Sequence, residues 1–117
     1  MSAGAFNIVI EQYATYALDL TITQNTGSGD MPMDLSEYQP RLQMRETAQS
    51  QEILLACNLA NGRIQTDALA GVIRITLSAE ETGQLWWETA VYDLILEGPD
   101  TIRLLAGQVE ILPGVTR

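Results

Sequence analysis

The sequence predicts an all-β fold, an antiparallel β-sandwich with one short helix near residues 79–86. Two observations carry this prediction. Short runs of alternating apolar and polar residues recur along the chain, and they are rich in the isoleucine, valine and threonine that favour strands. Turn-forming residues separate these runs, without long helical patterns between them. The chain has 117 residues, of which 46% are hydrophobic, so residues 1–117 are expected to form a single domain with one core.

Two alternating runs are expected as the first strands, at residues 6–12 and 16–22. The second run has one apolar and one polar face, which is typical of an antiparallel sheet with one side in solvent. Residues 25–34, with the sequence NTGSGDMPMD, concentrate turn formers and are the longest expected loop. The next strand is expected at 38–45, with Pro40 at a bulge or an edge because proline has no N–H to donate.

A hairpin and a further strand are expected in the middle of the chain. Residues 53–57 supply the first strand of the hairpin, and Asn61-Gly62 forms a tight turn that requires positive φ. Residues 63–66 are the predicted return strand. The run at 71–77 follows, in which isoleucine and leucine alternate with polar residues.

A capping box marks the one expected helix. Ser78 and Glu81 have the S-x-x-E spacing in which each side chain accepts a hydrogen bond from the other's backbone amide. This spacing predicts a helix at about residues 79–86. Glu80 and Glu81 are neighbours at a helix start and point in different directions, so we interpret them as capping residues and not as paired catalytic carboxylates.

The C-terminal part of the sequence predicts two more strands. They are expected at 92–96 and 102–112, joined by a turn at 98–100, with a bulge at Gly107. About seven or eight short strands and no βαβ rhythm indicate a sandwich of roughly the size of an immunoglobulin domain. Alternation alone also allows a small closed barrel. The residues expected to point into the core are Leu18, Leu20, Leu42, Met44, Ile73, Ile75, Leu94 and Leu96.

The charge balance excludes several classes of function. Fifteen acidic residues against six arginines give a net charge of −9, with no lysine and no histidine. Nucleic acid and anionic membranes are therefore poor partners. Histidine and lysine catalysis and histidine metal ligands are excluded, so we predict no enzyme activity, no cofactor and no metal.

Cys57 is the only cysteine, and its apolar neighbours favour a small buried side chain over a reactive thiol. No disulfide can form within the chain, so stability must come from packing. The sequence shows neither a signal peptide nor an apolar run long enough to cross a membrane. We therefore expect synthesis in the cytoplasm of the host cell, without membrane insertion.

Three acids around the expected loop, Asp30, Asp34 and Glu37, could collect on a hard cation such as calcium. Their spacing matches no twelve-residue calcium loop, and acids in loops rich in glycine and serine are usually solvated turn residues. We therefore predict no metal site at this cluster.

Interface candidates come from two places in the sequence. Adjacent Trp86 and Trp87 cannot both face one core. Either one caps the sandwich while the other lies across its rim, or the outward one is an interface anchor or a sugar-stacking platform. A long loop with flexible glycines can reorganise on docking. From that loop the interface candidates are Asn25, Gly27, Gly29, Met31 and Met33.

The segments at 34–38 and 41–45, DLSEY and RLQMR, resemble a pattern found in small immunoglobulin-like β-sandwich proteins encoded among phage and prophage tail genes. The resemblance continues through 71–82, 92–94, 103–107 and 115–117, and so covers residues 34–117. The family is similar to the N-terminal domain of baseplate proteins that hold receptor-binding fibres, and it has no catalytic residues. The stretch at Phe6 to Gln12 precedes the family's usual first strand, and a following fibre domain is lacking.

The resemblance implies a structural component of a phage tail or baseplate, in the virion, that acts as an adaptor. Its expected partners are fibres and neighbouring tail proteins, with self-association in a symmetric assembly. The alternative is a carbohydrate-binding module that recognises host-surface glycans through Trp86 or Trp87. A sugar platform requires an aromatic face in a concave site, whereas an adaptor requires an apolar patch that a partner covers.

Overall fold

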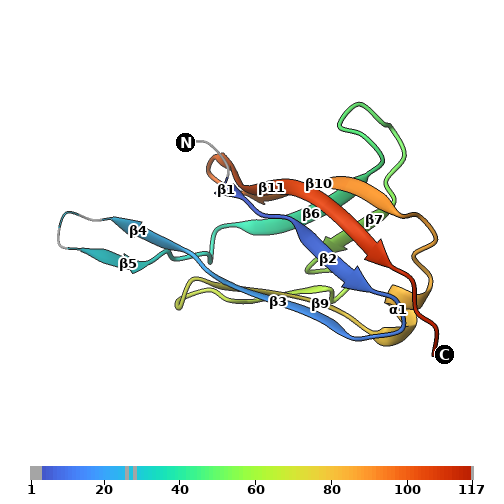
Figure 1. Cartoon of the computed structure of the whole chain (residues 1–117). Helices are drawn as coiled ribbons and strands as arrows, with labels where there is room; N and C mark the ends of the chain where they lie inside the picture. The colour runs from blue at the N-terminus through green and yellow to red at the C-terminus, as the bar shows by residue number, and fades with distance from the viewer. Residues whose placement is uncertain (1–3, 26, 28, 117) are drawn as a thin grey trace.

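The computed structural model describes residues 4–25, 27 and 29–116, which form two packed β-sheets with a projecting ribbon (Figure 1). The larger sheet is six-stranded, with the order β1-β11-β10-β6-β7 and with β2 also paired to β11. Its strands are β1 (Gly4–Ala5), β2 (Ile8–Glu11), β6 (Gln39–Arg45), β7 (Leu55–Asn58), β10 (Thr89–Glu97) and β11 (Thr101–Leu112).

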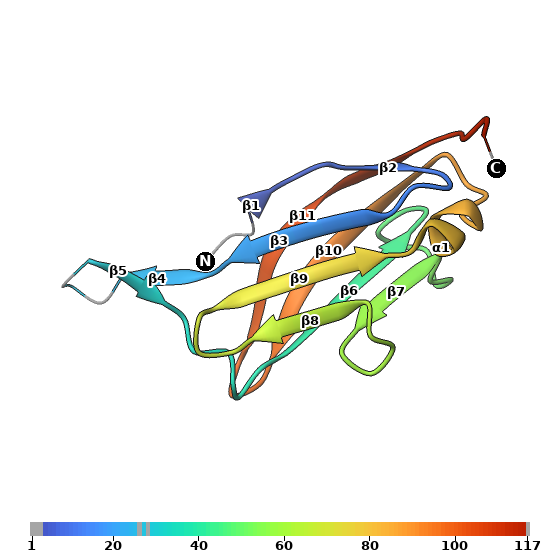
Figure 2. The ribbon, with the colours of Figure 1, turned by 90° about the horizontal axis from the view of Figure 1, so that it is seen from below.

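The smaller sheet is three-stranded, with the order β3-β9-β8, and it covers one face of the larger sheet (Figure 2). Its strands are β3 (Tyr16–Thr21), β8 (Ile64–Asp67) and β9 (Val72–Leu77). Helix α1 (Ala79–Gly83) connects β9 to β10 and so joins the two sheets. No strand of one sheet pairs with a strand of the other in the described residues, so the fold is a sandwich and not the closed barrel that alternation also allowed.

The core lies between the sheets, where the alternating side chains of both meet. Six of the eight predicted core residues are buried, with 3% or less of each exposed: Leu42, Met44, Ile73, Ile75, Leu94 and Leu96. The other two, Leu18 and Leu20, pack against this core but are only half-buried. They lie on β3, which has a partner on one side only, so their burial is incomplete.

Strands β1 and β2 run parallel to β11, whereas the other strand pairs of the described residues are antiparallel. Gly107 is not the predicted bulge, because the β10–β11 register shifts between Leu94 and Ile95 instead. Gly107 instead lets the backbone of Phe6 lie close to β11, because a Cβ at Gly107 would collide with that backbone. The Tyr92 hydroxyl donates to the Phe6 carbonyl at 2.6 Å, which further fixes the N-terminal segment on this sheet.

The predicted hairpin around Asn61-Gly62 is wrong, although the turn itself is confirmed by a φ of 76° at Gly62. Strand β7 pairs with β6, whereas β8 pairs with β9 in the opposite sheet. The turn therefore carries the chain from one sheet to the other. Both strands can bury their apolar faces this way, because Cys57 and Ile64 then enter the core from opposite sides.

Helix α1 begins as predicted and ends earlier. The capping box is present, with the Ser78 and Glu81 side chains each bonded to the other's backbone amide. The helix stops at Gly83 and not at 86, because Leu85 and Trp87 are both buried. Residues two apart share one side of an extended chain but not of a helix. The described residues contain no helix with the length and hydrophobicity needed to span a bilayer.

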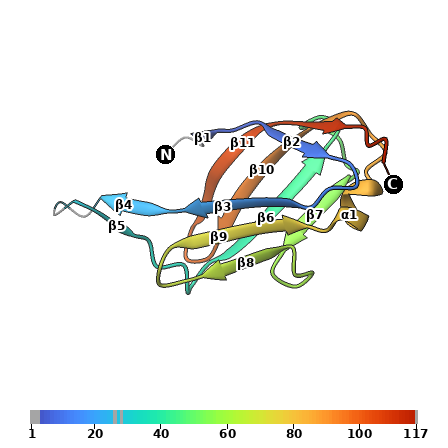
Figure 3. The same cartoon turned by 60° about the horizontal axis from the view of Figure 1, so that its bottom comes forward.

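The expected loop at 25–34 is largely a two-stranded ribbon of β4 (Thr23–Asn25) and β5 (Asp30–Pro32), which projects from one end of the sandwich (Figure 3). Helix α1 and the C-terminal segment lie at the other end of the molecule, whose extents are 50 × 29 × 24 Å. Pro40 has the predicted edge position, since β7 pairs with β6 only from Arg41 onward.

Candidate functional site

The two tryptophans face opposite ways, as their adjacency predicts. Trp87 is buried in the core with 7% exposed, whereas Trp86 is 78% exposed. The segment between α1 and β10 is extended here, so the flanking Leu85 and Trp87 turn inward and Trp86 turns out. Trp86 is therefore the surface indole among the interface candidates.

Trp86 is one of several large exposed hydrophobic residues that the chain brings to this end of the sandwich, and we name this set the α1-end patch. Its members are large exposed hydrophobic residues from three separate segments of the chain: Tyr13, Trp86, Leu112 and Val115. Val115 is 93% exposed, whereas Tyr13 and Leu112 are each a little more than one-third exposed. An exposed apolar patch of this kind is typical of an interaction surface.

The side chain of Gln12 holds these segments together. Its Nε2 donates to the carbonyl of Leu85 at 2.8 Å, and its Oε1 accepts from the amide of Gly114 at 3.0 Å. Each of the three tied residues directly precedes a patch member in the sequence, namely Tyr13, Trp86 or Val115. A second tie, from the Ile111 amide to the Glu88 carbonyl at 2.8 Å, fixes the chain beyond Trp86. The backbone segments that carry the patch members are thus tied to one another.

Tyr13 lies between two glycines that leave room for its ring. A Cβ at Gly83, at the end of α1, or at Gly114, in the C-terminal segment, would collide with the Tyr13 ring. Tyr13 itself has a φ of 64°, the only positive φ of a non-glycine residue in the part of the chain that the structure describes. A strained backbone at a bulky residue persists where the surrounding packing fixes it.

The sequence predicts an outward tryptophan at 86 or 87 but gives no sign that Gln12, Tyr13 and Leu112 belong to the same site. A hydrogen bond from Gln12 to Leu85 spans 73 positions of the sequence, so no local pattern reveals it. Val115 was noted only as part of the C-terminal segment of the resemblance. The packing of Tyr13 between Gly83 and Gly114 can be recognised only once the fold is known.

The arginines leave little free positive charge on the described surface. Four of them form ion pairs, Arg41 with Glu97, Arg63 with Glu81, Arg74 with Asp19 and Arg103 with Asp93. Arg45 donates to the carbonyls of Ser50 and Gln51 at 2.8 Å each. Within the described part of the chain, eleven of the fifteen acidic residues form no ion pair with an arginine. Glu11 and Glu88 adjoin the α1-end patch, so its rim is acidic.

The predicted loop candidates do not join the α1-end patch, because the ribbon lies at the opposite end of the molecule (Figure 1). Met31, on β5, is 51% exposed, whereas Met33 is half-buried against the core. Gly27 and Gly29 have the positive φ values, 85° and 113°, that the tip of the ribbon requires. Asn25 ends β4 opposite Asp30.

The three acids considered for calcium do not form a site. Among the residues that the structure describes, no three potential ligand side chains come together. The Asp34 carboxylate accepts the backbone amide of Ser36 at 2.9 Å, and this hydrogen bond lowers the pKa of Asp34. Asp34 is therefore a turn residue, as predicted from its place in a loop rich in glycine and serine.

Cys57 lies in the core on β7, and burial raises the pKa of its thiol to about 11. The thiolate is the reactive form, so a thiol with such a pKa is unreactive at neutral pH. This confirms the predicted packing role of Cys57.

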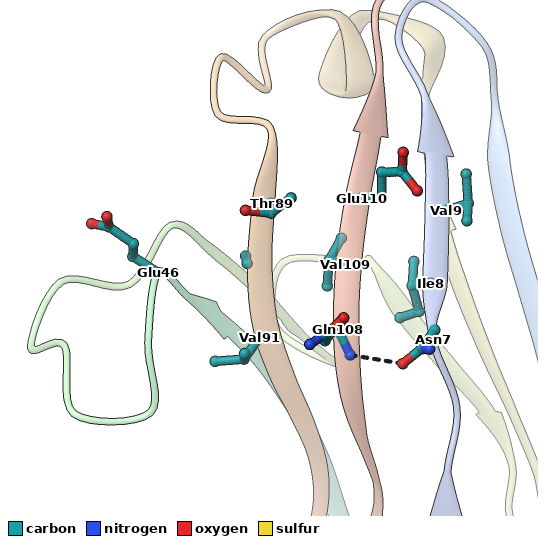
Figure 4. Close-up of a pocket in the computed structure, with 10 residues that line it drawn as sticks. Asn7, Ile8, Val9, Glu46, Thr89, Val91, Gln108, Val109 and Glu110 are labelled. Atoms are coloured by element: carbon teal, nitrogen blue, oxygen red, sulfur yellow. Dashed lines mark hydrogen bonds between the residues drawn. The ribbon is translucent and has the colours of Figure 1, made fainter.

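Two shallow hollows lie on the outer face of the six-stranded sheet. The first, of about 400 Å³, is lined by side chains that include Asn7, Val9, Thr89 and Gln108, with Glu46 and Glu110 (Figure 4). The second, of about 560 Å³, has Gln43, Arg45 and Asp93 among its lining residues. A third, of about 350 Å³, lies beside the C-terminal segment. Trp86 lines none of these three hollows.

The sequence matches no protein-family model and no curated protein. Two solved structures are similar along almost the whole chain. The first is a structure of the extracellular domains of the voltage-gated sodium channel β4 subunit, described as a parallel homodimer that explains a role in cell–cell adhesion. Its TM-score is 0.53 at 12% sequence identity, and the match covers 98% of this chain and 97% of that one. The other, from work on multimeric cell-adhesive interactions of these β subunits, has a TM-score of 0.52 at 14% identity, covering 96% of each chain. These similarities show that the chain has an immunoglobulin-like β-sandwich fold.

Proposed function

We propose that this chain is a non-catalytic structural subunit of a phage tail or baseplate, an adaptor that docks onto fibres or neighbouring tail proteins in the virion. The observation that carries this proposal is the α1-end patch, in which Trp86 is 78% exposed on a segment that Gln12 fixes. An exposed indole on a backbone segment that hydrogen bonds hold in place is the kind of group that anchors protein interfaces.

Three further observations support an adaptor. The resemblance of residues 34–117 to tail-gene sandwiches gives the biological setting. The acidic rim at Glu11 and Glu88 favours a partner whose socket carries lysine or arginine around an apolar centre. One protein of similar fold is described as a parallel homodimer with a role in cell–cell adhesion, which supports a binding role and self-association in a symmetric assembly.

The position of Trp86 favours docking over glycan recognition. Sugar-binding sites are concave and combine an aromatic face with several convergent polar groups. Trp86 stands outside the hollows described above, and its neighbours in the patch are apolar. We therefore place the carbohydrate-binding module second.

The experiment is particle assembly with Trp86→Ala in the virus or prophage that encodes the chain. We expect particles that lack fibres or fail to assemble, while the purified variant melts like the parent because Trp86 packs little against the core. The matched control is Leu69→Ala, since Leu69 is 77% exposed but lies in the turn between β8 and β9. That control should assemble normally.

Two results would contradict the adaptor. Complete Trp86→Ala particles that no longer adsorb to cells, together with glycan binding by the purified parent, would establish the carbohydrate-binding module instead. Normal particles with normal adsorption would show that the α1-end patch has no role in docking.

A further inference from the structure

The smaller sheet has a long edge without a strand partner. Strand β3 pairs with β9 through Tyr16 to Thr21, and β4 pairs with β5 through Thr23 to Asn25. Ile22 connects the two strands, and its amide donates to the Gly71 carbonyl at 2.7 Å while its carbonyl accepts from the Met33 amide at 2.9 Å. The N–H and C=O of one strand residue point to the same side. Both β9 and β5 therefore lie on one side of a nearly continuous strand from Tyr16 to Asn25, which we name the β3–β4 edge.

The N-terminal segment, which could have covered this edge, belongs to the other sheet. Strands β1 and β2 both pair with β11, and the Asn7 side chain accepts the Gln108 amide at 3.0 Å between them. Strand β2 runs on the same side of the sandwich as β3 (Figure 3), but the two do not pair in the part of the chain that the structure describes. The β3–β4 edge is left open as a result.

The direction of the free backbone groups follows from Ile22. Because backbone groups alternate sides along a strand, Leu18 and Leu20 share the orientation of Ile22 and direct their N–H and C=O toward β9. Ala17, Asp19 and Thr21 direct theirs toward the open side. These groups of β3 have no backbone partner in the described residues, and they have the spacing that an added antiparallel or parallel strand requires.

The apolar side chains of β3 are also incompletely covered. Tyr16, Leu18, Leu20 and Ile22 point toward the core yet remain half-buried. Their counterparts on the neighbouring strand β9 are buried, with Ile73 at 0% and Ile75 at 3% exposed. A strand added to the edge would thus gain both backbone hydrogen bonds and apolar contacts.

The other edge of the same sheet offers fewer free backbone groups and no half-buried apolar side chain. Strand β8 has only four residues, and its inward side chain Ile64 is already buried at 1% exposed. Short edge strands are one means by which proteins avoid unwanted pairing. The contrast makes the β3–β4 edge the accessible one.

Charge decides which strand fits. Asp19 lies at the middle of β3, where one carboxylate oxygen is 3.6 Å from Arg74 of β9 and 62% of its side chain is still exposed; Asp30 lies on the ribbon. A second copy would bring another net charge of −9 and a second Asp19 to the edge, and a charge on an edge strand opposes self-pairing. A strand with lysine or arginine opposite Asp19 would instead be attracted.

We infer that the β3–β4 edge is a docking site for an extended, positively charged segment of a different protein, which adds to the three-stranded sheet as a fourth strand. The α1-end patch has different residues, so a negative result at the β3–β4 edge would leave the adaptor role untouched, and the reverse also holds.

The probe is a panel of synthetic peptides in which lysine or arginine alternates with valine, isoleucine or threonine. The measurement is backbone amide exchange by NMR on the full chain. We expect these peptides to slow exchange at Ala17, Asp19 and Thr21 several-fold, whereas the same peptides with glutamate in place of the cations should have no effect. Asp19→Lys should reverse the preference, so that the acidic peptides protect the edge.

Proline variants separate strand addition from nonspecific attraction. Thr21→Pro removes an N–H that points to the open side, which an edge strand tolerates. Thr66→Pro is the matched control on the other edge strand, β8. The Thr76 amide donates to the Arg63 carbonyl, so Arg63 directs its backbone groups toward β9. Thr66 lies three residues further along the chain, so its N–H points to the outer side. Thr21→Pro should abolish peptide protection, and Thr66→Pro should retain it.

The inference is overturned if no peptide of the panel protects the edge, or if Thr21→Pro and Thr66→Pro behave alike. Protection that rises with protein concentration in the absence of peptide would assign the edge to a second copy, and this too would overturn a docking site for a different, positively charged protein.

Discussion

Strands β10 and β3 have the same alternating sequence pattern but differ in how deeply they are buried. In β10, Tyr92, Leu94 and Leu96 are at most 5% exposed, because β11 and β6 flank the strand on both sides. In β3, Leu18 and Leu20 face the same core but remain half-buried, because β9 flanks the strand on one side only. The pattern determines which face a residue is on, and the number of neighbouring strands determines how far it is buried. We therefore expect β10 to contribute more to the stability of the fold, whereas β3 keeps apolar surface available for a partner.

The largest expected effect is on the β10 side of this comparison. Leu94→Ala removes a side chain that is 0% exposed and leaves a cavity between the sheets, so we expect a loss of about 2–5 kcal/mol in the free energy of unfolding. Denaturant unfolding measures this loss. Leu69→Ala, at a residue that is 77% exposed, is the control and should change stability little. A Leu94→Ala variant as stable as the parent would show that β10 is not central.

A smaller loss is expected where β3 continues into the ribbon. Gly71 has a φ of 68°, and a Cβ there would lie 2.5 Å from the Ile22 carbonyl oxygen and 2.9 Å from that of Met33. Gly71→Ala should therefore cost about 2–3 kcal/mol, through backbone strain and displacement of the ribbon base. Gly62→Ala is matched in φ, at 76°, but meets nothing within 4 Å, so it should cost about 1 kcal/mol. Equal midpoints of thermal unfolding for the two variants would rule out the close approach at Gly71.

Leu20→Ala tests the edge strand directly. Leu20 is half-buried, so its truncation removes less buried surface than that of Leu94, and we expect a loss of about 1–2 kcal/mol. The ratio of the Leu20→Ala and Leu94→Ala losses, measured under one set of conditions, gives the difference in burial between the strands. A loss at Leu20 as large as that at Leu94 would mean that another element covers β3 in solution.

Much of the fold follows from local sequence. Alternation predicts the faces of β3, β6, β9 and β10, and the capping box predicts the start of α1. The change of sheet at Asn61-Gly62 could not be predicted, because a tight turn is equally compatible with a hairpin and with a corner between sheets. The ribbon was missed for a related reason, since its turn-forming residues mask three-residue strands.

Less of the candidate site could be predicted. Adjacent tryptophans require that one face outward, but the choice of Trp86 depends on the inward turn of Leu85 and Trp87. The α1-end patch exists only because Gln12 binds Leu85 and Gly114, residues 73 and 102 positions away. Composition and periodicity contain no information on contacts at such separations. The open β3–β4 edge likewise depends on which strand the N-terminal segment joins, a choice between two sheets that its alternation leaves undetermined.

The smallest expected effect concerns the connection between the two regions, where α1 links the sheet of β3 to β10. The Glu81 carboxylate accepts the Ser78 amide at 2.9 Å and pairs with Arg63, and these contacts lower the pKa of Glu81. A group whose pKa is lower in the folded state stabilises the fold above its ordinary pKa, here 4.5, and loses that contribution as the pH falls through the folded value.

Both partners are partly exposed, so Glu81→Gln should cost only about 0.2–1 kcal/mol at neutral pH. The difference between variant and parent should shrink below pH 4.5 and vanish in stronger acid, as followed by urea unfolding across the pH range. Glu80→Gln, in the same helical turn but outside the capping box, is the control and should cost less stability than Glu81→Gln at neutral pH. A Glu81→Gln loss that is constant with pH would mean that packing or capping geometry, and not the charge of Glu81, stabilises the connection.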